Sequence, residues 1–253
     1  MKNYKAKVLE NIQVSKDIYR VKFAAPAFAK EARPGQFMEV LPVGAGAPFL
    51  RRPFGVHTVD IKEGSVSFLF KKVGRGTALL SALKPGEILD VTGALGKGFE
   101  IKKGKTHIIA GGGMGIAPLL FLAQVLKAQG ESVKIFLAAR TAQEIPCLED
   151  FKKCGEVTIS TDDGTLGEKC FIDTPLTRAL KTLNNPVIYA CGPHAMLRCV
   201  AGLKAEVQVS LEEKMACGFG VCQGCPVEVK NKDTKYKMVC KEGPVFNAED
   251  IVW

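Results

Sequence analysis

Four cysteines near the end of this 253-residue chain constrain its structure more than any other feature. Cys217, Cys222 and Cys225 follow a C-x4-C-x2-C spacing, and 14 residues separate the third from Cys240. This is a ligand spacing of [2Fe–2S] clusters, in which four thiolates hold the iron atoms. A cluster of this kind moves one electron at a time. The pattern therefore predicts that these four cysteines bind a metal cluster and that the chain handles electrons.

The residues between the ligands are suited to such a site. A short chain can wrap a small inorganic core only if its backbone turns tightly. Glycine permits the positive φ angles and the close backbone approach that this needs, and we expect that role for Gly218, Gly220 and Gly224.

Two other uses of the cysteines agree less well with the pattern. Structural zinc usually takes two short C-x2-4-C or H-x3-5-H pairs, whereas this chain has a single C-x2-C pair and three histidines distant from it. Disulfides are disfavoured by the odd total of nine cysteines and by an N-terminus without the apolar stretch of a signal peptide. The remaining cysteines, apart from Cys191, are interpreted as buried or incidental thiols.

Composition excludes several classes of protein. The apolar content of 47% is sufficient for real hydrophobic cores. No run of residues is long and apolar enough for a transmembrane helix, so we expect a cytoplasmic protein with no membrane partner. The formal charge of +9 comes from lysines spread along the chain rather than from a basic block, which argues against a nucleic-acid partner.

The hydrophobic pattern changes twice along the chain, which predicts three domains with limits at 1–100, 101–207 and 208–253. The first should be a small closed β-barrel, because six short strands are separated by Pro/Gly turns. The second should be a parallel α/β sheet, because apolar strands alternate with helical stretches. The third carries the four cysteines. The predicted strands are Lys5–Val14, Ile18–Ala24, Phe37–Pro42, Gly55–Asp60, Ser65–Lys72, Ile88–Thr92, Thr106–Ala110, Val133–Ala138, Val157–Thr161 and Val187–Ala190.

A glycine-rich turn follows the first strand of the second domain. It reads Gly111-Gly-Gly-Met-Gly-Ile-Ala-Pro118 and opens a predicted helix over 117–129. Glycines let a phosphate approach the backbone, and a helix N-terminus supplies free N–H groups. The turn departs from G-x-G-x-x-G, so a purely structural tight turn is the alternative. The candidate nucleotide-binding residues are Gly112, Gly113, Gly115 and Pro118.

A second turn supports the nucleotide-binding interpretation. Cys191-Gly192-Pro193 lies at the carboxyl end of the fourth predicted strand of this domain, where open α/β sheets bind their ligands. Cys191 could therefore lie against a nicotinamide ring. The alternative is a small buried hydrophobic side chain.

The first domain carries a possible phosphate site. Arg52, in Leu50-Arg-Arg-Pro-Phe-Gly55, could bind a phosphate through two parallel hydrogen bonds. Gly74-Arg-Gly-Thr77 enters a short helix whose N–H groups could hold another part of the same pyrophosphate. Each signal alone is weak, since such an arginine is usually solvated. Together, in a barrel that precedes a dinucleotide-binding domain, they indicate a flavin.

The combination of motifs resembles the ferredoxin–NADP reductase superfamily, and the cysteine region narrows this to one family. The stretch from Glu212 to Val227, followed by Val239-Cys-Lys-Glu-Gly-Pro-Val-Phe246, resembles electron-transfer subunits of dihydroorotate dehydrogenase B over essentially the whole chain. The resemblance implies a Greek-key barrel that binds FAD, an α/β domain that binds NAD and a C-terminal [2Fe–2S] domain.

Carried over by position, the resemblance assigns an FAD site in the barrel. Its residues would be Arg52, Pro53, Phe54, Gly55, Leu69, Phe70, Lys71, Gly76 and Thr77. One of them departs from the family, which usually has serine where Gly55 stands, with its hydroxyl near flavin N5. The glycine removes that donor. Flavin binding itself is still expected.

The resemblance also implies a mechanism and a partner. An FMN-containing catalytic subunit, with two copies of each subunit in the complex, would oxidise dihydroorotate in pyrimidine biosynthesis. Its electrons would pass through the cluster and FAD to NAD+, and no catalytic residue for dihydroorotate oxidation is expected in this chain. Arg140 alone does not decide between NAD and NADP, and the resemblance favours NAD. The alternatives are an NAD(P)H:ferredoxin or hydrogenase-linked oxidoreductase subunit, and a zinc-holding regulatory subunit.

Overall fold

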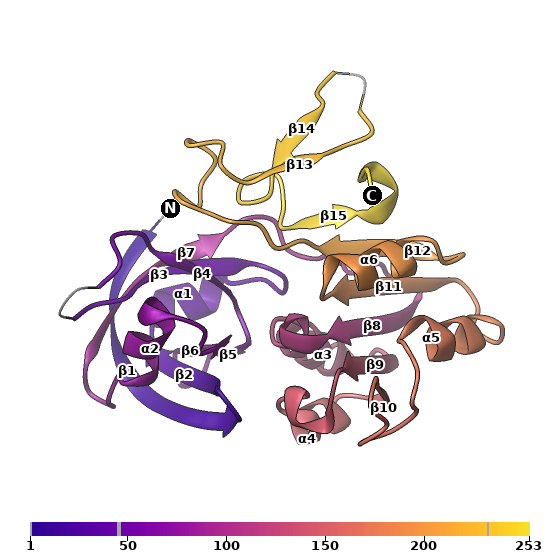
Figure 1. The fold of residues 1–253 in the computed structure, drawn as a ribbon, viewed down its shortest axis with the longest axis horizontal. Coiled ribbons are helices and arrows are strands. Elements are labelled where there is room, and N and C mark those ends of the chain that lie inside the picture. Colours follow the sequence, from indigo (N-terminus) through magenta and orange to yellow (C-terminus); the bar gives the residue numbers. More distant parts are fainter. Residues whose placement is uncertain (1, 45–46, 232) are drawn as a thin grey trace.

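The computed structural model describes residues 2–44, 47–231 and 233–253. An antiparallel sheet and a mainly parallel sheet lie side by side, and a two-stranded hairpin stands above them (Figure 1). Among the described residues, no helix is long and apolar enough to cross a membrane.

The first sheet is antiparallel and has the order β4-β3-β7-β1-β2-β6-β5. Its inner face buries apolar side chains such as Val21, Phe23 and Phe68. Two short helices, α1 (Pro26–Glu31) and α2 (Arg75–Ser81), belong to the same region. The strands are β1 (Lys2–Ser15), β2 (Ile18–Ala24), β3 (Phe37–Leu41), β4 (Arg52–Gly55), β5 (Thr58–Asp60), β6 (Ser65–Lys71) and β7 (Ile88–Leu95).

The two edge strands of this sheet explain why it curls. β4 and β5 stand at opposite ends of the strand order, yet only Val56 and His57 separate them in the chain. The Val56 N–H donates to Gln36 at one edge, and the His57 N–H donates to Ser67 at the other. So short a link draws both edges together, and β4 lies against β6. The predicted barrel is confirmed, but the single predicted strand over 55–60 is wrong, because the chain changes edges inside it.

The second sheet has the order β10-β9-β8-β11-β12-β15, with the first five strands parallel. This confirms the predicted α/β class. β12 and β15 were not predicted from the sequence, and β15 pairs antiparallel with β12. The strands are β8 (Thr106–Gly112), β9 (Val133–Ala139), β10 (Glu156–Thr161), β11 (Pro186–Cys191), β12 (Glu206–Ser210) and β15 (Val245–Asn247).

Helices cover both faces of the parallel sheet, which explains its nearly continuous apolar strands. Ile109 of β8 packs in one cluster with α3 and α4, whereas its neighbours Ile108 and Ala110 pack in the other with α5 and α6. A 3-10 turn, η1 (Gly113–Ile116), precedes α3, so that helix begins two residues later than predicted. The helices are α3 (Leu119–Ala128), α4 (Leu148–Lys152), α5 (Asp173–Leu180) and α6 (His194–Ala201).

The C-terminal region joins the second sheet and also bonds to the segment that follows the first. Its hairpin consists of β13 (Pro226–Glu228) and β14 (Tyr236–Met238). The chain then returns, and Gly243 accepts a hydrogen bond from the Lys97 N–H, just beyond the barrel strand β7, at 2.6 Å. Pro244 accepts one from the Leu211 N–H at 2.9 Å. The last segment thus adds a strand, β15, to the second sheet. The domain limits at 100 and 207 stay a prediction.

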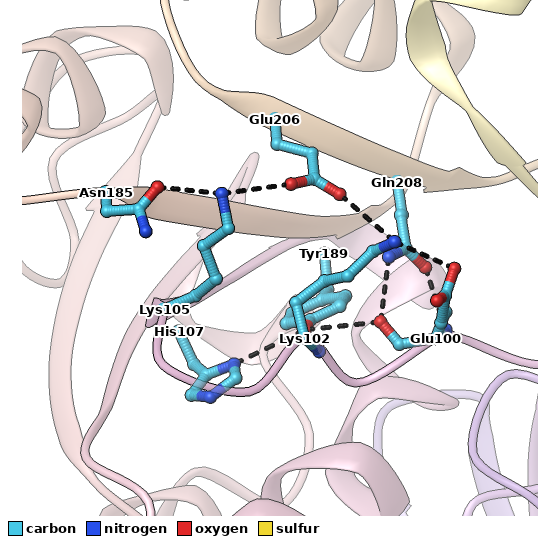
Figure 2. A network of polar contacts seen from close by, with 8 residues as sticks. All are labelled: Glu100, Lys102, Lys105, His107, Asn185, Tyr189, Glu206 and Gln208. Atoms are coloured by element: carbon cyan, nitrogen blue, oxygen red, sulfur yellow. Dashed lines mark hydrogen bonds and ion pairs between the residues drawn. The ribbon is translucent and has the colours of Figure 1, made fainter.

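A polar network fixes the segment that leaves the barrel (Figure 2). The Glu100 backbone N–H donates to Gln208 Oε1 at 2.9 Å, and Gln208 Nε2 donates to the Glu100 carbonyl at 2.8 Å. The Lys102 N–H donates to the Tyr189 hydroxyl at 3.2 Å. Both Gln208 and Tyr189 are buried side chains of the parallel sheet. The linker is therefore held against the strands β11 and β12, which orients the barrel relative to the second sheet.

Candidate functional site

A cleft of about 360 Å³ lies between the barrel and the carboxyl ends of the parallel strands. Ten predicted nucleotide-binding residues line it: Arg52, Pro53, Phe54, Gly55, Leu69, Phe70, Lys71, Thr77, Pro118 and Cys191. Eight of these were assigned to FAD, while Pro118 and Cys191 were assigned to NAD. One cleft therefore joins the two predicted sites. Gly76 does not line it but is buried behind Arg52, where an added Cβ would lie 3.4 Å from Arg52 Nε.

Some of the residues that line this cleft were not predicted from the sequence. The C-terminal region and the end of β12 contribute Ser210, Leu211, Glu212, Glu213, Met215 and Pro244, and the barrel adds Gly35 and Phe37. The Glu-x-x-Met stretch before the first ligand cysteine was visible as part of the cysteine motif. Its contact with the cleft depends on how the last segment folds back, which the motif does not encode.

Gly55 packs closely against Pro118 because it has no side chain. A Cβ built on Gly55 would lie 2.8 Å from the Cβ of Pro118, which is closer than real Cβ contacts come. The barrel and the glycine-rich turn therefore meet at this point. This contact gives a steric reason for glycine in place of the serine that the resemblance led us to expect.

The glycine-rich turn lies at the switch point of the parallel sheet. β8 and β11 are neighbours, and their carboxyl ends bring the turn beside Cys191, as expected for a ligand site of this sheet type. A Cβ on Gly115 would lie 2.4 Å from the Gly192 nitrogen. The two predicted turns are thus in direct backbone contact, and only glycine fits between them.

Residues of these turns also line two further cavities. One of about 330 Å³ is lined by Gly112, Gly115, Gly192 and Pro193, among others. A larger one of about 640 Å³ is lined by Gly112, Gly113 and Pro193, together with Arg140 and Phe171. The predicted NAD residues therefore line three spaces around the two turns.

The Cys191 thiol is held in its neutral form. Its side chain is 1% exposed, and burial raises the pKa of the thiol well above its usual value, although the Ser210 side chain and the Gly192 backbone bond to it. A neutral thiol is a poor nucleophile. Cys191 can therefore act as a packing surface in the cleft without reacting with a ligand.

Arg52 is placed at the cleft by its own loop. Its Nη1 donates to the Leu50 carbonyl at 2.7 Å and to the Arg51 carbonyl at 3.1 Å. Thr77 closes the nearby glycine turn, because its Oγ1 accepts the Val73 and Gly74 N–H groups at 2.9 and 3.1 Å. A fixed guanidinium beside a glycine turn is a donor set that suits a pyrophosphate, so the residues present fit the phosphates of FAD.

The four predicted ligand cysteines lie as two pairs. The Cys222 N–H points at Cys217 Sγ at 3.5 Å, and the Cys240 N–H points at Cys225 Sγ at 3.4 Å. Across the described parts of the chain, no three His, Cys, Asp or Glu side chains stand together at metal-ligand spacing. The thiols therefore lie in two pairs, and the four together do not form a metal-ligand arrangement.

The loop backbone follows the prediction at two of its three glycines. Gly218 and Gly220 have φ angles of +76° and +88°. Gly224 does not adopt a positive φ, whereas the neighbouring Gln223 does, at +54°. The prediction of positive φ at Gly224 was therefore wrong. Its Cβ would make an ordinary contact, 3.5 Å from Cys222 Sγ.

The local electrostatics favour a thiolate at the first ligand position. Desolvation disfavours the charged form of Cys217, but the backbone N–H groups of Cys222, Phe219 and Val221 outweigh it and lower the pKa to about 6. In Cys240, burial and the neighbouring Cys225 thiol raise the pKa to about 12. Amide groups aimed at sulfur stabilise negative charge, so this donor set fits an anionic iron–sulfur cluster.

Three family models match successive parts of the chain. The oxidoreductase FAD-binding domain matches residues 5–99, the oxidoreductase NAD-binding domain matches 108–202, and the iron-sulfur cluster binding domain of dihydroorotate dehydrogenase B matches 212–252. With the fold and the cleft, they define the class: flavin- and nicotinamide-dependent oxidoreductases with an added iron–sulfur domain. The predictions of FAD, NAD and an iron–sulfur cluster are thereby confirmed at the level of domains.

Full-length relatives narrow the class. The dihydroorotate dehydrogenase B (NAD(+)) electron transfer subunit of Caldanaerobacter subterraneus subsp. tengcongensis is 40% identical over 254 residues, covering 98% of each chain. The protein of the same name from Fusobacterium nucleatum subsp. nucleatum is 38% identical over 253 residues, covering 96% of each. The chain belongs to the family of dihydroorotate dehydrogenase B electron transfer subunits, which confirms the resemblance inferred from the motifs.

Solved structures agree with this fold. The NADH-dependent reduced ferredoxin-NADP oxidoreductase structure superposes with a TM-score of 0.88 at 28% identity, covering 99% of this chain and 90% of that one. The ferredoxin reductase in carbazole 1,9a-dioxygenase superposes with a TM-score of 0.69 at 25% identity, covering 81% and 66%. The first match extends over all three regions.

Proposed function

We propose that this chain is the electron-transfer subunit of an NAD-dependent dihydroorotate dehydrogenase and connects an FMN-containing catalytic subunit with NAD+. The observation that carries the proposal is the path of the C-terminal segment. Cys240 belongs to the cysteine site, and Pro244, only four residues later, lines the cleft between the barrel and the parallel sheet. The two predicted redox sites are therefore joined by one short stretch of chain, with Cys240 and Pro244 buried at its ends.

The cleft residues have separate tasks in this proposal. Arg52 and the turn ending at Thr77 would hold the FAD pyrophosphate, while Phe54 and Leu69 would exclude water from the flavin. Gly112, Gly113 and Gly115 would let the NAD phosphates approach the backbone, and Cys191 would pack beside the nicotinamide. Cys217, Cys222, Cys225 and Cys240 would bind the cluster. A cluster exchanges single electrons, a nicotinamide exchanges a hydride, and a flavin accepts either.

In this proposal, the chain contributes by positioning FAD, NAD and the cluster relative to one another. No acid or base in this chain is assigned to dihydroorotate oxidation, which belongs to the partner in this proposal. We further propose a cytoplasmic complex with two copies of each subunit. None of the nine cysteines forms a disulfide, as is usual in a reducing compartment.

Tandem purification with cofactor analysis tests the proposal. The tagged chain, expressed in its native host, is expected to carry FAD, iron and sulfide and to co-purify with an FMN protein that forms orotate with NAD+. The ferredoxin-linked alternative predicts instead reduction of a soluble ferredoxin by NADH without an FMN partner. A colourless chain that contains zinc would overturn both.

A further inference from the structure

Glu39 of β3 is a buried carboxyl group without a partner, and burial raises its pKa to about 7. Its side chain is 1% exposed, and neither Oε1 nor Oε2 accepts a hydrogen bond. No other carboxylate among the described residues has a buried oxygen in this condition. Burying a carboxyl group without a hydrogen-bond partner costs free energy. Its presence in a barrel strand therefore indicates a role for Glu39 beyond packing.

The nearest cations are bound elsewhere. Arg51 Nη2 pairs with Asp90 Oδ1 at 2.9 Å, and Lys5 pairs with the other oxygen of Asp90 at 2.6 Å. Lys2, which lines the same cavity as Glu39, pairs with Glu31. Arg52, the other cation near Glu39, donates to the Leu50 and Arg51 carbonyls. Glu39 therefore has no ion-pair partner among the described residues.

What Glu39 does face is the cysteine loop. A Cβ built on Gly218 would lie 2.6 Å from Glu39 Cγ and 2.8 Å from Glu39 Oε1. A cavity of about 330 Å³ beside Glu39 is also lined by Cys217 and Phe219. The loop backbone next to the first ligand cysteine thus lies directly over the carboxyl group.

The strand that carries Glu39 also reaches the flavin cleft. Phe37 lines that cleft and packs with the C-terminal region. Residues two apart in a strand point to the same face, about 7 Å from each other. Phe37 and Glu39 therefore place the cleft and the cysteine loop against one rigid strand.

We propose that Glu39 is a positioning residue for the cluster-binding loop. Its carboxyl oxygens accept backbone N–H groups of the Cys217–Gly218 stretch when the four thiolates are drawn together. The barrel thereby fixes the loop, and with it the separation between cluster and flavin. This inference rests on the proposed function, because it requires that the cysteines hold a cluster.

Two substitutions distinguish the role of the acceptor from simple packing. Glu39→Gln keeps an acceptor oxygen, and Glu39→Met has a similar length without one. Glu39→Ala is a second variant without an acceptor. Glu10→Gln is the matched control, because Glu10 belongs to the same barrel but bonds Arg20 at 2.8 Å. The full chain, loaded with FAD and cluster, is tested for iron release to a chelator and for the EPR spectrum of the reduced cluster.

We expect Glu39→Met and Glu39→Ala to release iron roughly 10-fold faster or more and to change the EPR spectrum, with FAD content unchanged. Glu39→Gln should remain near the wild type, and Glu10→Gln should be indistinguishable from it. Wild-type iron release and EPR in either acceptor-free variant that retains FAD would overturn the inference and leave the proposed function intact. A wild-type chain that binds FAD and no cluster would overturn both.

Discussion

The Nδ1 atom of His57 lies 2.6 Å from the carbonyl oxygen of Ala117. His57 follows the barrel strand β4, and Ala117 precedes α3 of the parallel sheet. Because a carbonyl only accepts, Nδ1 must carry the proton. The bond joins the two walls of the flavin cleft.

This relationship predicts that acid weakens the fold. Burial lowers the pKa of His57 from 6.5 to about 4, so the unfolded chain binds a proton that the folded chain excludes. The stabilisation is present above pH 6.5 and is lost as pH falls from 6.5 towards 4, by about 3 kcal/mol in total. Urea unfolding at several pH values measures it. His57→Gln should flatten this dependence, while His194→Gln, on the exposed start of α6, should not. An unchanged pH slope in His57→Gln would contradict the assignment.

Restoring a side chain at Gly55 should be unfavourable. The new Cβ would meet Pro118 at 2.8 Å, and overpacking of this kind costs about 1–3 kcal/mol. We expect Gly55→Ser and Gly55→Ala to lose similar stability and to bind FAD more weakly, as measured by thermal unfolding and flavin fluorescence. Gly202→Ala, where the nearest atom is 3.4 Å away, is the control. If serine bound FAD as well as glycine does, the steric explanation would fail.

Loss of one cluster ligand should separate two activities. Cys222→Ser removes an exposed ligand without touching the flavin cleft. Electron transfer from the partner subunit should be abolished, whereas FAD-dependent oxidation of NADH by an artificial acceptor should persist. Cys170→Ser, outside the cysteine site, should retain both. Survival of both activities in Cys222→Ser would show that the cluster assignment is wrong.

The contact between the two nucleotide-binding turns gives another prediction. Gly115→Ala would place a Cβ 2.4 Å from the Gly192 nitrogen and 2.5 Å from the Cys191 carbonyl carbon. Separating the turns should weaken NADH binding by about 10-fold or more, the equivalent of about 1.4 kcal/mol. Stopped-flow reduction of the flavin at varied NADH concentrations measures this, and bound FAD serves as the internal control. Unchanged NADH dependence would mean that the turns do not act together.

Features encoded over a few adjacent residues were predictable from the sequence. The cysteine spacing, the glycine-rich turn and Cys191-Gly-Pro each specify a local backbone or donor set, because ligand chemistry and tight turns depend on near neighbours. Strand alternation indicated both sheet types for the same reason. These patterns were sufficient to predict the three cofactors and the family.

The tertiary structure alone decided how these parts meet. Gly55 faces Pro118, Glu39 faces Gly218, and Pro244 returns from the cysteine site to the flavin cleft. Each relationship joins positions that lie far apart in the chain or in different sheets, and each depends on close packing between surfaces. Residue type and spacing carry no record of such contacts, since they arise only when the barrel, the parallel sheet and the C-terminal segment pack together.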